Sequence, residues 1–108
     1  ISMIRQPDFV TEKIHQWAVT QVMKKKKVDA SPSKLWTYEE GLCVQIMHRG
    51  SFDDEPRTVL KLENFLKESS YRNDIGDLRK HHEIYLSDPR KSEPEKMKTV
   101  IRHPIAEK

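Results

Sequence analysis

The sequence predicts an α+β fold in which an antiparallel sheet carries its helices on one face. Residues 42–48 form the strongest strand pattern, and residues 54–69 place apolar side chains at helical spacing. Two further strand patterns follow at residues 81–86 and 99–105. The order strand, helix, strand, strand, with the helix confined to one part of the chain, is typical of α+β domains.

The first part of the chain predicts one helix between two short strands. Residues 1–5 resemble the end of a strand that Pro7 stops, and residues 28–33 predict a loop. Between them, a helix is expected to open near Asp8 or Thr11 and to run to about Lys27. Its apolar stripe predicts core packing for five side chains, which are Val10, Ile14, Trp17, Ala18 and Val22.

The next two segments predict strands separated by a turn at residues 39–41. Residues 35–39 place Trp36 and Tyr38 on one face. The strand over residues 42–48 is expected to place one set of side chains on a common face, namely Leu42, Val44, Ile46 and His48. Cys43 lies in this strand, and as the single cysteine of the chain it cannot form an internal disulfide. It is interpreted as a buried structural thiol, and it fits a reducing compartment.

The second half of the chain predicts a helix and the last two strands. Acidic residues and Pro56 suit a first helical turn, and the buried stripe is expected to contain Val59, Leu62, Phe65 and Leu66. Residues 72–80 predict a polar loop. The final strand over residues 99–105 contains Pro104, which favours an edge position or a strand end because proline lacks the backbone N–H.

The strand over residues 81–86 is the most informative segment for function. Alternation predicts His82, Ile84 and Leu86 on a mostly apolar face that packs on helices, and His81, Glu83 and Tyr85 on the other. If that second face lines a cavity, Glu83 is a candidate for holding a cation or for proton transfer. Such an open sheet face needs a cover, which predicts a ligand, a second repeat or a second subunit.

Composition excludes several classes of partner. The chain of 108 residues has a net charge of only +3, from 20 basic and 17 acidic residues, so no nucleic-acid partner is expected. The block at residues 24–27 is interpreted as lysines that complement a helix C-terminus. No apolar run approaches the roughly 20 residues that span a bilayer. With no export leader in the sequence, a cytoplasmic location without membrane contact is expected.

The five histidines do not predict a metal site. His81 and His82 are neighbours on a strand and point to opposite faces, and no cysteine or carboxylate spacing completes a ligand set. No glycine-rich phosphate loop is present, so no cofactor is expected. His48 has two interpretations, as a hydrogen-bonded structural residue or as a residue at the mouth of a ligand groove.

Several segments, taken in order, resemble the GyrI-like small-molecule-binding family, whose domain is also the effector-binding part of some AraC-type and MerR-type regulators. They span nearly the whole chain, and the most specific surrounds Glu83. These segments are Gln6–Glu12, Glu39–Gly50, Asp53–Thr58, His81–Lys91 and Pro94–Arg102.

The resemblance implies a particular domain organisation. Stand-alone family members are about twice as long and carry two strand-helix-strand-strand repeats that face each other around a groove. This chain resembles the second repeat, over residues 35–108, preceded by a terminal strand and connecting helix over residues 1–34. With the first repeat absent, a homodimer is expected to rebuild the groove wall. The family's usual Pro-Tyr after the glycine is here Ser51-Phe52.

The resemblance also implies a function centred on Glu83. The leading hypothesis is a groove that binds amphipathic or cationic organic molecules. The residues expected to line it are Glu83, Tyr85, Trp36, Tyr38, His48 and Phe52. The first alternative is a hydrolase that opens strained cyclopropane rings, with Glu83 as the catalytic residue that handles protons. The second alternative is an interaction module that inhibits a larger protein such as DNA gyrase through its surface.

Overall fold

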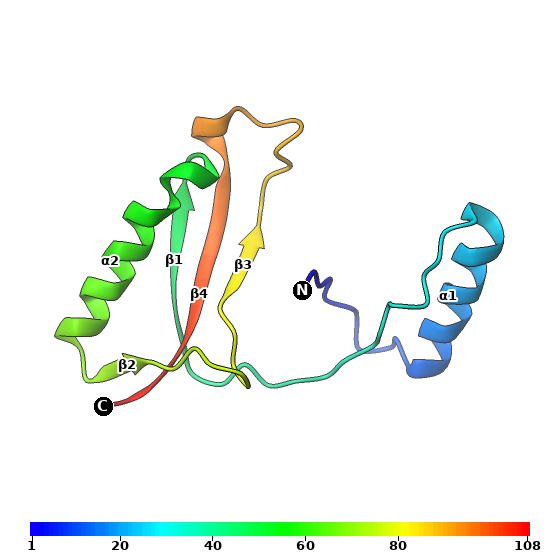
Figure 1. The fold of residues 1–108 in the computed structure, drawn as a ribbon, viewed down its shortest axis with the longest axis horizontal. Helices are drawn as coiled ribbons and strands as arrows, with labels where there is room; N and C mark the ends of the chain where they lie inside the picture. The colour runs from blue at the N-terminus through cyan, green and yellow to red at the C-terminus, as the bar shows by residue number, and fades with distance from the viewer. The chain divides into compact units, whose positions relative to one another are not determined.

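The computed structural model describes residues 1–108 and divides into two compact units, Ile1–Tyr38 and Glu39–Lys108 (Figure 1). The first unit contains a single helix. The second contains a four-stranded sheet and a helix that packs on it.

The helix of the first unit is α1 (Glu12–Lys26), which confirms the predicted helix. The Thr11 side chain caps it by accepting a hydrogen bond from the backbone N–H of Ile14 (3.3 Å), and the αL residue Lys27 (φ 51°) ends it. The helix has no buried residue, and Trp17 is 64% exposed, so the predicted core role of Trp17 is wrong. The unit has no second helix or sheet against which an apolar stripe can pack.

The strands predicted at residues 1–5 and 35–39 are also wrong, because neither segment pairs with another strand. Trp36 and Tyr38 nevertheless lie on the same side of the backbone, as their spacing predicts. Their rings stack with centroids 4.5 Å apart and planes inclined by 15°.

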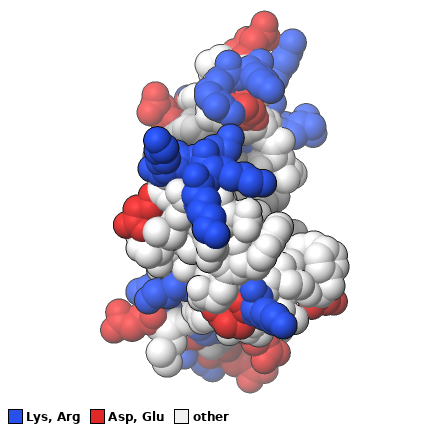
Figure 2. Space-filling model, turned by 90° about the vertical axis from the view of Figure 1, so that its right-hand side faces the viewer, with Lys and Arg blue, Asp and Glu red and all other residues white.

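Charged side chains of both signs lie on the surface (Figure 2). Three lysines occupy the last turn of α1, where they complement the helix dipole. On the face drawn in Figure 2, basic side chains gather in the upper part, and acidic side chains lie beside them. This mixture agrees with a net charge of only +3.

The second unit is built around one central strand. The strands β1 (Cys43–Arg49), β2 (Tyr71–Asn73) and β3 (His82–Tyr85) all pair with β4 (Lys98–Glu107), and every pair is antiparallel. The helix α2 (Glu55–Glu68) follows β1. The predicted order of strand, helix, strand, strand is confirmed, with β2 added at the start of the segment that the sequence predicted as a polar loop.

The core lies between α2 and one face of the sheet. Its buried members come from α2 and β4 and are Leu62, Leu66, Ile101 and Ile105, against which Val44, Ile46, Val59 and Tyr71 pack. Figure 1 shows α2 running beside β1 and β4. Phe65, which the sequence analysis assigned to the buried stripe, is instead 58% exposed because it lies on the flank of the helix.

The central strand tolerates Pro104, so the prediction that proline confines this strand to an edge or end is wrong. On the side of β4 away from β1, β3 pairs with residues up to Arg102 and β2 pairs from Ile105 onward. Pro104 falls between these two partners, and its carbonyl accepts from the backbone N–H of Asp74 (2.9 Å). The N–H that proline lacks would point to the same side as this carbonyl, away from β1, so the pairing of β1 with β4 loses no hydrogen bond.

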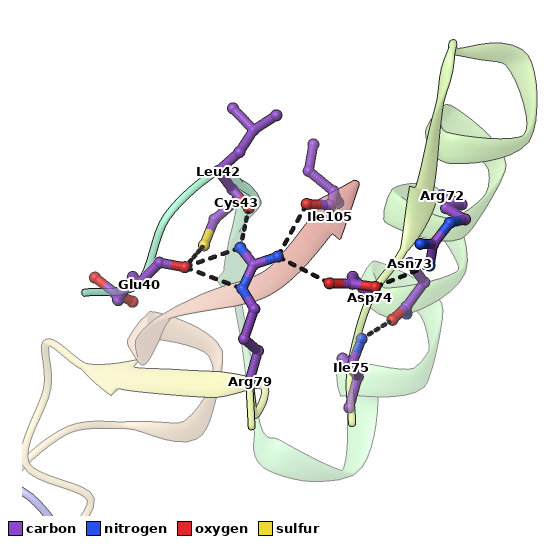
Figure 3. Close-up of polar contacts among 9 residues, drawn as sticks. All are labelled: Glu40, Leu42, Cys43, Arg72, Asn73, Asp74, Ile75, Arg79 and Ile105. Atoms are coloured by element: carbon purple, nitrogen blue, oxygen red, sulfur yellow. Dashed lines mark hydrogen bonds and ion pairs between the residues drawn. The ribbon is translucent and has the colours of Figure 1, made fainter. Parts of the chain in front are cut away.

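The guanidinium group of Arg79 holds the chain together where β1 begins and β4 ends (Figure 3). It donates to the carbonyl of Glu40 (2.8 and 3.3 Å), to that of Leu42 (2.6 Å) and to that of Ile105 (3.1 Å). It also pairs with the carboxylate of Asp74 (3.0 Å). One planar group thus satisfies three backbone carbonyls and a carboxylate.

Candidate functional site

The strand register places Glu83 on the face of the sheet that α2 covers. Glu83 and Ile46 both lie opposite Ile101, which is part of the core beneath α2. Tyr85 lies opposite Thr99 on the same face, since side chains two residues apart share a face. The candidate site is therefore at the edge of the helix-covered face.

The opposite face carries His82 and Ile84, which lie opposite Arg102 and Val100. The prediction that these side chains pack on helices is wrong. Instead, Nη1 of Arg102 donates to both carboxylate oxygens of Glu40 (2.9 and 3.0 Å), and His82 Nδ1 lies 3.5 Å from the same carboxylate. The hydrophobic side chain of Ile84 favoured burial under a helix, but the register decides the face.

Glu83, Tyr85 and Phe52 form the accessible part of the site. The Tyr85 hydroxyl donates to Glu83 Oε2 (2.8 Å), and the Phe52 ring meets the Tyr85 ring edge to face with centroids 5.6 Å apart. Tyr85 is 60% exposed and Phe52 43% exposed. The hydrogen bond to Glu83 raises the pKa of Tyr85, so the phenol stays protonated near neutral pH.

Glu55, the first residue of α2, is a member of the site that the sequence analysis missed. Its Oε1 atom is buried and accepts no hydrogen bond. Burial, followed by the neighbouring Glu83, raises the pKa of Glu55 to about 7. The hydrogen bond from Glu55, and a further one from Tyr85, lower the pKa of Glu83. Below about pH 7, Glu55 is therefore mostly protonated at a pH where Glu83 is ionised.

The signal that could have found Glu55 is its helical spacing. It precedes Val59 by four residues, Leu62 by seven and Leu66 by eleven, so it belongs to the stripe that faces the sheet. The sequence analysis interpreted the acidic residues here only as favourable charges in a first helical turn, and so it did not assign Glu55 to the stripe that faces the sheet.

His48 lies beneath the site and is 2% exposed. Its Nε2 contacts the carbonyl oxygen of Ser51 (2.7 Å), and its Nδ1 contacts the hydroxyl of Thr58 (2.7 Å). Because a carbonyl only accepts, Nε2 donates, and in the neutral ring Nδ1 accepts from Thr58. The imidazole therefore ties the turn before Phe52 to the second turn of α2.

Four of the six predicted ligand-binding residues lie in the second unit, where the structure brings them together: His48, Phe52, Glu83 and Tyr85. Trp36 and Tyr38 lie in the first unit and are 61% and 40% exposed. No group of three or more histidine, cysteine or carboxylate side chains is arranged to hold a metal ion. No helix combines the length and hydrophobicity needed to cross a membrane.

Comparison with known proteins decides the family. Residues 10–106 match the GyrI-like small molecule binding domain. The chain belongs to the GyrI-like family. No curated protein matches it.

Solved structures agree with this GyrI-like assignment. A hydrolase from Listeria innocua is 53% identical and superposes with a TM-score of 0.88, and a conserved protein from Listeria innocua is 54% identical with a TM-score of 0.90. Each superposition covers 94% of this chain but only 52% and 50% of the respective relative. This GyrI-like chain thus spans about half the length of the structures it matches.

Proposed function

We propose that this GyrI-like domain binds amphipathic or cationic organic molecules at a site centred on Glu83. The observation that carries the proposal is an ionised carboxylate beside two accessible aromatic rings, those of Tyr85 and Phe52. A cation over an aromatic face gains roughly 0.5–2 kcal/mol, depending on how much water it loses. The carboxylate adds Coulomb attraction, which is stronger where the dielectric constant is low.

The remaining walls of the groove come from outside residues 35–108 in this proposal. Relatives are about twice as long, which supports an organisation in which these residues form one repeat and residues 1–34 a connecting segment. A second copy of the chain, or a first repeat, then covers Glu83. Within the first unit, the exposed rings of Trp36 and Tyr38 stack on each other, and we propose that they too can contact a planar aromatic ligand.

A second candidate function is hydrolysis of a strained ring, and two observations favour it. A structure 53% identical to this chain is that of a hydrolase, and Glu55 supplies a carboxyl group with a pKa of about 7 beside the ionised Glu83. Glu83 would take a proton from water as the water oxygen bonds to a carbon of a cyclopropyl ketone. The ring C–C bond breaks, its electron pair moves to the carbonyl oxygen as an enolate, and that oxygen takes up a proton from solvent.

The test is calorimetric titration with tetraphenylphosphonium, a cation with four aromatic rings, of the parent and of Glu83→Gln. We expect affinity to fall about tenfold, equivalent to about 1.4 kcal/mol, because the amide removes the charge and keeps the shape. Glu68→Gln, at the far end of α2, is the matched control and should bind like the parent. Equal affinity in the parent and in Glu83→Gln would contradict the proposal.

The same variants separate the two candidate functions. A binding domain leaves a cyclopropyl ketone probe unchanged. A hydrolase converts it to the ring-opened alcohol, and Glu83→Gln loses rate while keeping affinity for this neutral probe.

A further inference from the structure

A second aromatic surface begins two residues before Glu83. His81 immediately precedes β3, and alternation places its side chain on the face that carries Glu83 and Tyr85. The register that puts Glu83 opposite Ile101 puts His81 beside His103 when it is carried two residues further. The two imidazole rings stack there, with centroids 5.5 Å apart and planes inclined by 11°. The face that holds the site therefore continues past the paired part of β3.

The two rings of this stack differ in exposure. His103 is 5% exposed in the central strand β4, and Val44 of β1 lies opposite it. Its Nδ1 atom is buried and makes no hydrogen bond, and burial lowers the pKa of the ring, which is uncharged near neutral pH. His81 is exposed, so the part of its ring that does not contact His103 is accessible to a ligand.

An aromatic pair also lies on the other side of Glu83. Tyr85 follows Glu83 by two residues, and the Phe52 ring meets the Tyr85 ring edge to face. Because a strand rises about 3.3 Å per residue, His81 and Tyr85 each lie about 7 Å from Glu83 along the strand, in opposite directions. Glu83 is therefore flanked by aromatic rings at the two ends of a line about 13 Å long.

We propose that His81 selects elongated ligands that carry an aromatic ring at each end. One ring packs against Tyr85 and Phe52, and the other stacks on the exposed ring of His81. The inference rests on the proposed function and adds to it a residue that determines ligand length. A ligand with a single ring gains only one of these contacts. A second aromatic contact raises affinity by about threefold to tenfold, but only for a ligand long enough to reach both ends.

The first test compares two probes that differ by one ring. Bis(3-phenylpropyl)dimethylammonium has a phenyl ring on each side of its nitrogen, and (3-phenylpropyl)propyldimethylammonium lacks one of them. Calorimetry on the full chain should show about threefold to tenfold tighter binding of the two-ring probe. In His81→Ala this affinity ratio should fall close to one, while the one-ring probe binds as before. His81→Phe keeps a ring and should keep the ratio, and so should His82→Ala, whose side chain lies on the opposite face.

The second test observes His81 directly in the parent chain, without any substitution. The imidazole proton signals are followed by NMR while each probe is added. The two-ring probe should shift the signals of His81, because a phenyl ring placed over the imidazole changes the local magnetic field. The one-ring probe should shift them less, and the signals of His82 should stay in place with both probes.

The outcomes separate this inference from the proposed function. An affinity ratio near one in the parent, or a ratio that persists in His81→Ala, overturns the role of His81. A ratio that is lost in His81→Phe overturns it too, because the ring surface alone is then insufficient. In each of these cases, a one-ring probe that binds the parent and weakens in Glu83→Gln leaves the proposed function intact. Failure of both probes to bind the parent overturns the proposed function and the inference together.

Discussion

Ile101→Ala is expected to lower the free energy of unfolding by about 2–5 kcal/mol, because it leaves a cavity in the core. Ile101 is 1% exposed at the centre of β4 and packs with Leu62 and Leu66 of α2. A small domain is stable by only about 5–15 kcal/mol, so this loss is large. Urea denaturation monitored by circular dichroism measures it.

The neighbouring residue provides the control for Ile101. Val100→Ala changes a half-buried side chain on the opposite face of the same strand and should cost only about 1 kcal/mol. Equal losses in the two variants would mean that α2 does not seal one face of the sheet. Because Glu83 lies opposite Ile101 on that face, Ile101→Ala should also weaken ligand binding.

Arg79→Met is expected to cost about 2–4 kcal/mol of unfolding free energy, because several acceptors lose their donor at once. The guanidinium joins the carbonyls of Glu40 and Leu42, which both precede β1, to that of Ile105 in β4. Methionine keeps much of the aliphatic length and removes every hydrogen bond. Chemical denaturation compares the variant with the parent.

Arg72→Met is the matched control for this prediction. Arg72 pairs with the same carboxylate, Asp74 (2.8 Å), but its side chain is 55% exposed, compared with 27% for Arg79. An exposed ion pair contributes little, so Arg72→Met should lose a small fraction of what Arg79→Met loses. Similar small losses in both variants would show that water replaces the guanidinium at the three carbonyls.

Local sequence patterns were sufficient to predict α1, whose backbone hydrogen bonds lie within the helix, and β1, whose apolar residues alternate clearly with the others. Thr11 and the apolar spacing predicted α1, and the alternation around Val44 and Ile46 predicted β1 and the face it buries. The same reasoning failed for residues 1–5 and 35–39, because a strand exists only when a second strand supplies its hydrogen bonds. The predicted burial of Trp17 failed for a related reason, because an apolar stripe on a helix is buried only where another helix or a sheet packs on it.

The site was predictable only in part. Glu83 and Tyr85 are two residues apart, so alternation alone placed them on one face, and the hydrogen bond between them follows from that. Glu55 is 28 residues earlier in the sequence, and its approach to Glu83 requires both the packing of α2 and the pairing of β3 with β4. No pattern within a single helix or strand relates residues so far apart in the sequence.

The amino-acid sequence by itself determined the α+β class, the GyrI-like resemblance and the pairing of a carboxylate with a phenol on one strand. These properties depend on residue type and on spacing within one element. The tertiary structure alone decided that Glu83 lies on the helix-covered face, that Pro104 sits in the central strand and that Glu55 meets Glu83. The physical reason is that strand register and helix packing bring distant residues into contact, and only such contact can bury a carboxyl group and change its protonation.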